Sequence, residues 1–247
     1  MEQSRKKFIK HFLVGATSVP LIIEACKKTD LASSSTSSSS GSSSSGSCIV
    51  IAEEVEGPYP YVGGEITNPL QRVDVTGGQT GVPLTLNFGV VNTNNSCAAV
   101  SNARIDIWHC NKDGYYSGYG NQTGGSLGTQ SYVGQTWLRG YQLTDASGKA
   151  QFITIYPGWY QGRATHIHIE VFVNNALKKT NQITFAESIS DVVHVSSLYA
   201  AHGINSMRTA SDGIFNNSAT DLANETVALT GSVAAGYAGS YTLGLAL

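Results

Sequence analysis

Alternation of apolar and polar positions dominates the chain after about residue 48. Six segments there alternate with period two and contain β-branched or aromatic residues, the pattern of half-buried β-strands. These segments are residues 84–91, 103–108, 150–155, 166–173, 182–185 and 240–245. Clusters of Gly, Asn and Asp separate them, as turns between strands require. The pattern predicts an all-β fold, an antiparallel β-sandwich with long loops and little helix, with a barrel as the alternative.

Neither helical periodicity nor charge is prominent in this part of the chain. Residues 186–208 accommodate a short helix or turns, and residues 212–235 indicate only loop and a final hairpin. Charged residues make up 13% of the chain, which argues against a coiled coil or a charge-driven disordered protein. Residues 48–247 carry 9 basic and 14 acidic side chains, so this part has a net charge of −5. Nucleic acid is therefore excluded as a partner.

The first 47 residues have the pattern of an export segment followed by a tether. Four basic side chains, from Arg5 to Lys10, precede an apolar stretch over residues 12–23, which is shorter than the roughly 20 residues of a membrane span. These features predict a secretory signal, with an amphipathic N-terminal helix as the alternative. Residues 33–47 are almost all Ser, with two Gly and Thr36, a composition that forms no core and behaves as a flexible linker.

The end of the export segment resembles a bacterial lipoprotein box. It reads Ile-Glu-Ala-Cys and ends at Cys26, the candidate for lipid attachment, with simple secretion as the alternative. We therefore divide the chain into an export segment over residues 1–26, a tether over residues 27–47 and one folded domain over residues 48–247. The protein is expected to be exported, and any contact with a membrane is expected only through lipid on Cys26.

Three further cysteines would lie in an oxidising compartment if the chain is exported. Cys97 and Cys110 flank a short loop and a predicted strand, so a bridge between them is one expectation. Cys48 could instead pair with either of them, and the connectivity is left open.

Two histidines on one predicted strand are the first candidate metal ligands. His166 and His168 are two residues apart, so their imidazoles share a face of the strand and suit Zn, Cu, Fe or Ni. The alternative is a polar sheet face with two hydrogen-bonded histidines. No acidic third ligand stands close by, since Glu170 lies one step further along that face. Tyr160 precedes His166 by six residues, after a Pro-Gly turn that can fold it back towards the pair.

A second cluster of tyrosines follows the predicted strand over residues 103–108. Tyr115, Tyr116 and Tyr119 lie in a Gly-rich loop, where binding and catalytic residues are often found. The alternative is that these tyrosines form amphipathic surface cover on a β-protein.

Taken together, these clusters resemble the intradiol ring-cleavage dioxygenases, the catechol and protocatechuate type enzymes with non-haem ferric iron. The resemblance rests on spaced motifs in one order. They are Glu56-Gly57-Pro58-Tyr59, Trp108-His109, Gly114-x-Tyr116-Ser117, Arg139-Gly140, Thr144-Asp145-x-x-Gly148, Thr154-Ile155-x-Pro157-Gly158-x-Tyr160, Arg163-x-x-His166-Ile167-His168 and Thr180-Asn181-Gln182-Ile183-Thr184-Phe185. Catechol-specific members carry a helical N-terminal dimerisation domain and protocatechuate members pair two chains. This sequence instead resembles the exported single-domain type, so its oligomeric state and its particular catechol stay open.

The resemblance implies a ferric ion held by Tyr116, Tyr160, His166 and His168. It also implies that a small aromatic diol binds the iron, reacts with O2 and is cleaved to a cis,cis-muconate type diacid. In that mechanism Tyr160 leaves the iron and takes a substrate proton, whereas Tyr116 stays bound. Tyrosine suits the ferric ion, a strongly charged Lewis acid that favours anionic phenolate.

Further residues acquire roles from the same resemblance. Arg163 would stabilise the electron-rich ring carbon that meets O2, with a structural salt bridge as the alternative. Gln182 would line the site, and Tyr59 would reach the substrate from the N-terminal side. The remaining candidates are expected to pack or to be exposed, namely Trp108, Trp159, His109, His194 and His202.

Two other functions compete with the dioxygenase. One is a transthyretin-like β-sandwich that binds a ligand without chemistry, which has no need of the tyrosines, histidines and arginine together. The other is a zinc hydrolase built on the histidine pair, which lacks a well-spaced third ligand and a carboxylate base.

Lipid attachment at Cys26 leads to the first testable prediction. Cys26→Ser is expected to move the protein from the membrane fraction to the soluble fraction, because the anchor depends on that thiol. Fractionation of cells that express each form, followed by immunoblotting, measures the distribution. An unchanged distribution would mean that the segment is a plain signal or an uncleaved anchor.

Overall fold

A computed structural model describes residues 48–60 and 70–247 of the chain. The predicted export segment and tether, residues 1–47, lie outside the described residues. In the described part, most of the regular structure is β-strand, in two five-stranded sheets and one two-stranded sheet. No helix in these residues is long and apolar enough to cross a membrane.

The first sheet carries the residues singled out above. Its strand order is β10 (Thr226–Val227), β9 (Ala176–Phe185), β8 (His166–Val173), β3 (Arg104–Trp108) and β6 (Arg139–Leu143). The second sheet contains β11 (Leu229–Ser232), β12 (Gly236–Leu245), β1 (Pro83–Asn92), β2 (Ala98–Ala99) and β7 (Lys149–Ile155), with β7 paired to β1. The small third sheet joins β4 (Gln122–Thr123) and β5 (Thr129–Gln130). Helices are short: α1 (Glu187–His194), α2 (Ala219–Glu225), η1 (Gly125–Leu127) and η2 (Thr209–Ser211).

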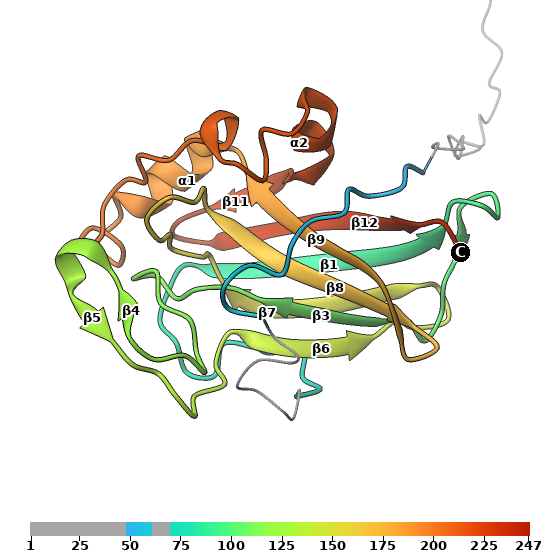
Figure 1. Cartoon of the computed structure of the whole chain (residues 1–247), viewed down its shortest axis with the longest axis horizontal. Helices are drawn as coiled ribbons and strands as arrows, with labels where there is room; N and C mark the ends of the chain where they lie inside the picture. Colours follow the sequence, from blue (N-terminus) through green and yellow to red (C-terminus); the bar gives the residue numbers. More distant parts are fainter. Residues whose placement is uncertain (1–47, 61–69) are drawn as a thin grey trace, which may run out of the picture. The chain divides into compact units, whose positions relative to one another are not determined.

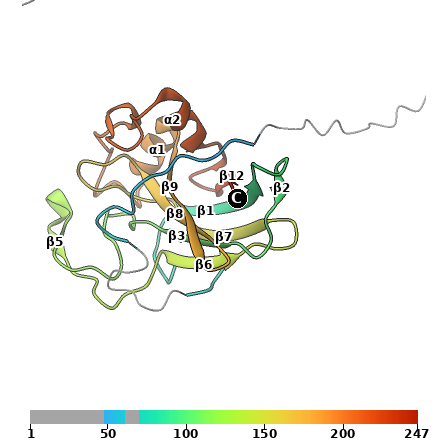
Figure 2. The same ribbon diagram turned by 45° about the vertical axis from the view of Figure 1, so that its right-hand side comes forward.

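The two larger sheets lie face to face, with β8, β9 and β3 in front of β1 and β12 in Figure 1. Figure 1 and Figure 2 place α1 and α2 on one side of the sheets. Between the sheets, the alternating side chains of β1 are buried, from Leu84 to Val90. They share one core with Ile105, Ile107 and the apolar residues of β8. The predicted β-sandwich is therefore confirmed.

The second face of β8 is also buried, which is unusual for an antiparallel strand at a sandwich surface. His166, His168 and Glu170 alternate with the core residues and are at most 2% exposed. One cover over this face is the segment of residues 48–60, here called the arm, which crosses in front of β9 and β8 in Figure 1. The arm is hydrogen-bonded to β9, where Gln182 donates to the carbonyl of Val55 at 2.8 Å. The outer face of the first sheet therefore offers a second, polar interior.

The strand predictions match β1, β3, β7 and β8, and β9 and β12 are longer than predicted. Two pairs are parallel rather than antiparallel, β1 with β12 and β9 with β10. Alternation reveals which residues share a face of the sheet, but it carries no information on strand direction. The parallel pairing was therefore not predictable from the local sequence. The missed strand β6 contains Gly140. A Cβ at this position would lie only 2.7 Å from Cγ1 of Val75, so a larger residue would clash there. This close approach accounts for a glycine that weakens the strand pattern.

The prediction of only loop and hairpin over residues 212–235 was wrong for α2. Ser218 caps this helix, because its hydroxyl accepts the backbone N–H of Asp221 at 2.9 Å. A serine followed three residues later by an acidic residue is a capping signal that the sequence does contain. By contrast, α1 lies in the stretch predicted to hold a short helix or turns, and β11 with β12 forms the expected final hairpin.

The expected Cys97–Cys110 bridge was wrong, because Cys97 is bonded to Cys48 and Cys110 is free and buried. Cys97 lies in the turn between β1 and β2, whereas Cys110 follows the far end of β3. Five strand residues separate the two positions, at about 3.4 Å each, which exceeds the reach of a disulfide. The observed bridge instead fastens the start of the arm to the second sheet.

This bridge leads to a stability prediction. Cys97→Ser is expected to lower the free energy of unfolding by about 2–4 kcal/mol, because the cross-link constrains a long loop of the unfolded chain. Urea unfolding followed by tryptophan fluorescence measures the change. Reductant should lower the stability of the wild type and leave that of Cys97→Ser unchanged. Equal stability of the two oxidised proteins would contradict the prediction.

Candidate metal centre

Three donor atoms converge on the buried outer face of the first sheet. Tyr116 Oη lies 3.3 Å from His166 Nε2 and 3.2 Å from His168 Nε2, and the two Nε2 atoms are 3.0 Å apart. Two ligands that each bind a metal at about 2.1 Å and at a right angle are themselves about 3.0 Å apart. The three atoms therefore have the mutual spacing of metal ligands, and all three residues are fully or almost fully buried.

The imidazole of His166 presents a lone pair to this point. His166 Nδ1 lies 2.6 Å from the carbonyl of Ala164, to which it must donate, and so Nε2 is left unprotonated in the neutral ring. Burial, with a contribution from Arg163, lowers the pKa of His166 to about 3. Burial and the neighbouring His166 also lower the pKa of His168 well below its usual value. Neutral imidazoles are the form that binds metals.

The ring of His168 is held between two elements. The indole of Trp108 is stacked on it, with ring centroids 4.8 Å apart and planes within 3°. On another side, Gly57 of the arm approaches so closely that a Cβ there would lie 3.1 Å from His168 Cε1. Gly57 also has a φ of +73°, which favours glycine. Trp108 therefore packs around the site, as expected from the sequence.

Tyr116 is fixed by the loop that follows β3. The side chain of Gln122 accepts the backbone N–H of Tyr116 at 2.6 Å and donates to its carbonyl at 2.7 Å. Tyr59 stacks on the phenol ring with a centroid distance of 4.5 Å. Tyr59 thus lies against Tyr116 from the arm, and its contact with substrate stays a prediction.

The burial of Tyr116 opposes ionisation of its phenol. Burial raises its pKa well above the usual value, with a further rise from Tyr160, whereas Arg163 and Arg139 act in the opposite direction. A buried phenolate needs a positive charge close by, which a metal cation at the three donor atoms would supply. The donor set therefore fits a hard, strongly charged cation.

Tyr160 lies beside the three donor atoms. Its ring centroid is 5.5 Å from that of His166 and 5.7 Å from that of Tyr116. Its hydroxyl accepts a long hydrogen bond from Arg163 Nη1 at 3.5 Å. Burial raises the pKa of Tyr160 to about 12, against the lowering effect of Arg163. The structure thus brings together all four residues predicted to hold iron.

Arg163 and Gln182 meet at the same place. Arg163 Nη2 donates to Gln182 Oε1 at 2.6 Å, and Arg163 Nε donates to Asp212 at 2.9 Å. The salt bridge considered as the alternative for Arg163 therefore exists, and the same guanidinium also contacts Tyr160.

Two charged residues of this region, Arg139 and Asp212, were assigned no individual role from the sequence. Arg139 is buried and donates to the carbonyls of Tyr59, Pro60 and Ser117, which fastens the arm to the loop of Tyr116. Its Arg-Gly motif was visible, but the contacts join segments far apart in sequence. Asp212 gave no signal, because it lies in a stretch read as loop.

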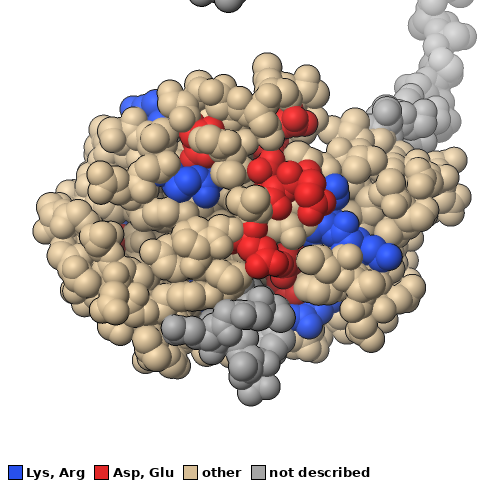
Figure 3. All heavy atoms as spheres, in the orientation of Figure 1, with Lys and Arg blue, Asp and Glu red and all other residues tan. Residues whose placement is uncertain are grey.

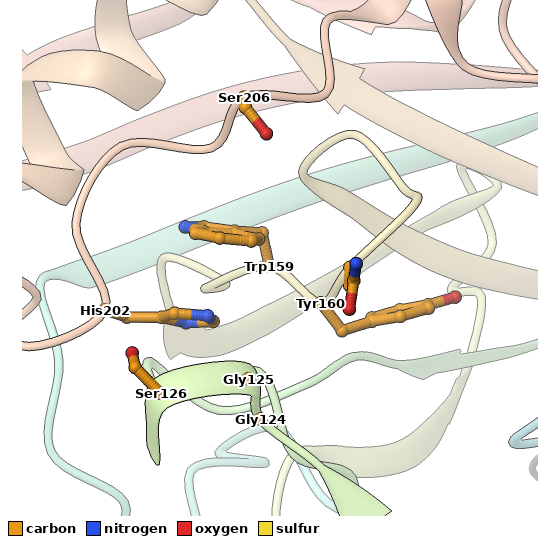
Figure 4. A pocket seen from close by; sticks show the side chains of 8 residues that line it. Gly124, Gly125, Ser126, Trp159, Tyr160, His202 and Ser206 are labelled. Carbon is orange, nitrogen blue, oxygen red and sulfur yellow. The ribbon is translucent and has the colours of Figure 1, made fainter. Parts of the chain in front are cut away.

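A cavity of about 290 Å³ adjoins Tyr160. Trp159 and His202 line it and stack on each other with centroids 3.9 Å apart. Figure 4 shows the hydroxyl of Tyr160 pointing away from this stack. His109 and His194 are buried elsewhere, and His109 Nε2 lies 2.7 Å from the Thr154 hydroxyl.

Carboxylates gather at the centre of the face shown in Figure 3. Burial, together with the charges of Glu54 and Asp221, raises the pKa of Glu225 to about 8. In the residues that the structure describes, no group of three or more His, Cys, Asp or Glu could hold a metal ion, so a metal site here depends on the tyrosines.

Comparison with known proteins places this arrangement in a family. A family model described as "Dioxygenase" matches residues 55–196, which include the four proposed ligands. An intradiol ring-cleavage dioxygenase from Tetranychus urticae has a similar structure, with 26% identity and a TM-score of 0.70 over 80% of this chain and 95% of that chain. The dioxygenase domain of a carbohydrate-binding fusion protein from Streptomyces sp. SirexAA-E shares the fold, at 21% identity and a TM-score of 0.56 over 80% of this chain and 98% of that domain.

A curated relative is also similar in sequence. Catechol 1,2-dioxygenase 1 of Acinetobacter lwoffii is 26% identical over 146 residues, which are 52% of this chain and 44% of that protein. The chain thus matches less than half of the length of that relative. From the matched family model, the fold and the order of its motifs, the chain belongs to the intradiol ring-cleavage dioxygenase family.

Proposed function

We propose that the protein is a non-haem Fe(III) intradiol dioxygenase. It cleaves a catecholic ring between its two hydroxylated carbons, and both atoms of O2 enter the cis,cis-muconate type diacid. The observation that carries this proposal is the convergence of Tyr116 Oη, His166 Nε2 and His168 Nε2 at mutual distances of 3.0–3.3 Å, beside Tyr160. We also propose that the protein is exported and carries lipid at Cys26.

Tyr116, Tyr160, His166 and His168 would hold the ferric ion. Two phenolates and two neutral imidazoles stabilise ferric over ferrous iron, since the negative charge resides on hard oxygen ligands. When bound, ferric iron supplies a Lewis acid that binds the diol and draws electron density from its ring. The facial triad of ferrous oxygenases requires a carboxylate, and the site offers tyrosine in that place.

The two tyrosines have different tasks in this proposal. Tyr116 is fully buried. Gln122 holds its backbone N–H and carbonyl, and Tyr59 stacks on its ring. Tyr160 is less enclosed, and its hydroxyl lies 3.5 Å from Arg163 Nη1 at the edge of the donor set. Tyr160 therefore accepts a proton from a substrate hydroxyl, while Tyr116 remains in place.

Arg163 supplies the fixed positive charge. Its guanidinium contacts Tyr160 and Gln182, so it faces the place where the substrate ring must lie if the diol takes the position of the Tyr160 hydroxyl. A permanent cation there stabilises the negative charge that develops on the ring carbon. Gln182 orients this cation and, through the carbonyl of Val55, joins it to the arm.

The arm limits the access of water to the same face. Gly57 lies against His168. Tyr59 stacks on Tyr116 and makes a T-shaped contact with the ring of Tyr160, with centroids 5.9 Å apart. Exclusion of water strengthens the electrostatic contacts of Arg163 and of the phenolates. The arm thus contributes to chemistry although it provides no proposed ligand.

The proposed difference between the tyrosines is testable by spectroscopy. Tyr160→Phe keeps three proposed ligands and some iron, but it loses its built-in base, so turnover should fall by about 10²–10⁴-fold. Its visible tyrosinate-to-iron band should weaken and persist with catechol, because Tyr116 still donates. In Tyr116→Phe the remaining band should vanish with catechol, since Tyr160 leaves and only catecholate bands remain.

Spectra of both variants are recorded anaerobically, with and without catechol. Identical behaviour of the two variants, or a resting spectrum that neither variant changes, would show that the two-tyrosine site is wrong.

The proposed histidine ligands lead to a separate prediction of metal content. His168→Ala should reduce bound iron strongly, because it removes one of three converging donors and leaves a buried gap. His202→Ala is the matched control, since this half-buried histidine lies in the cavity wall outside the donor set. Elemental analysis of purified protein measures iron per chain. Wild-type iron content in His168→Ala, or an equal loss in His202→Ala, would contradict the assignment.

A further inference from the structure

A fully buried carboxylate, Asp212, lies behind the site and outside the residues matched by the family model. Both of its oxygens are used. Oδ2 accepts Arg163 Nε at 2.9 Å and the backbone N–H of Ala164 at 2.6 Å. Oδ1 accepts the backbone N–H of Ile214 at 2.8 Å, which fixes the carboxylate within its own turn.

The contact with Nε determines how the guanidinium of Arg163 is directed. An arginine has five N–H donors in one rigid plane. Asp212 takes the Nε–H, Gln182 takes one from Nη2, and Tyr160 receives a long bond from Nη1. Because the plane is rigid, a charged partner at Nε sets the direction of the two terminal nitrogens towards Gln182 and Tyr160.

Through its hydrogen bond with Ala164, Asp212 is linked to His166, a proposed metal ligand. Ala164 donates its N–H to Asp212, and its carbonyl accepts Nδ1–H of His166 at 2.6 Å. That hydrogen bond sets the tautomer that leaves Nε2 free for metal. One carboxylate therefore holds both the residue that orients His166 and the cation beside Tyr160.

We propose that Asp212 is a positioning residue, which acts through Arg163 and through Ala164 on His166, in the reaction assigned above as the proposed function. If the Asp212–Arg163 ion pair were purely structural, it would stabilise the fold, and the direction in which the guanidinium points would not affect turnover. Instead, the carboxylate contacts the two residues on which the charge and the ligand orientation of the site depend.

The carboxylate is suited to this task because it stays ionised. Burial alone would raise the pKa of Asp212, but the N–H of Ala164 and the charge of Arg163 keep it below its usual value. The ring of Phe215 lies under the guanidinium carbon at 5.9 Å and closes its other side. The segment around Asp212 thus encloses Arg163 from behind.

The test compares Asp212→Asn, Arg163→Gln and the double variant, with catechol as the probe and iron content measured for each. Asp212→Asn should lower kcat by about 10–100-fold, as loss of an orienting partner typically does, with little change in KM and with iron retained. The double variant should be slower than Arg163→Gln alone by less than the full effect of Asp212→Asn, because part of that effect passes through the cation and part through Ala164 and His166. Asp191→Asn is the control, since it breaks a surface pair with Arg208 of 2.7 Å and should leave kcat unchanged.

A measurement on metal-free protein separates this proposal from the proposed function. In ¹⁵N spectra of the wild type, the Arg163 Nε–H should exchange slowly with solvent, and in Asp212→Asn it should exchange rapidly. If Asp212→Asn does not fold, Asp212→Glu keeps the charge, and it should displace the guanidinium and lower kcat.

The outcomes are distinct. Unchanged kcat in the folded Asp212 variant, or an equally slow Nε–H exchange, overturns the positioning role, and so do effects that multiply in the double variant. Failure of the iron-loaded wild type to cleave any catechol overturns the proposed function, whereas the exchange measurement still decides whether Asp212 fixes Arg163.

Discussion

The burial of both faces of β8 is the constraint on which the rest of the site depends. One face places Ile167, Ile169 and Val171 in the core between the sheets, and the other carries His166 and His168. A shift in register by one residue would exchange the faces and put both imidazoles in the core. Each buried aliphatic side chain contributes about 1.5–3 kcal/mol, so core packing fixes the direction of the imidazoles before any polar contact forms.

The same burial acts on the two kinds of proposed ligand in opposite ways. It keeps the imidazoles neutral, which favours metal binding, and it raises the pKa of Tyr116 and Tyr160, which disfavours phenolate. Arg163 and Arg139 offset only part of this effect on Tyr116. Since a phenolate and a bound cation stabilise each other, ionisation of these tyrosines and occupation of the site should be strongly coupled.

Local alternation predicted six of the strands and the histidine pair, and it missed β6 and the shorter strands. The alternation of β8 revealed its two faces, whereas the resemblance to a known family, carried by spaced motifs, gave Tyr116, Tyr160 and Arg163 as companions of the histidines. The parallel pairing of β1 with β12 and the Cys48–Cys97 bridge join residues far apart in the chain, on which period-two alternation is silent. Asp212 was missed for a related reason, because its partner is brought to it only by the fold.

Several contacts that organise the site are bonds from a side chain to a distant backbone group. Arg139 binds the carbonyl of Tyr59, Gln182 binds that of Val55, and Asp212 binds the N–H of Ala164. Every residue except proline presents an N–H and a C=O, so such contacts place no requirement on the side chain of the partner and leave no paired signature in the sequence. The sheet therefore sets where the donor atoms lie, whereas these backbone contacts decide how the arm, the tyrosine loop and the segment of Asp212 close around them.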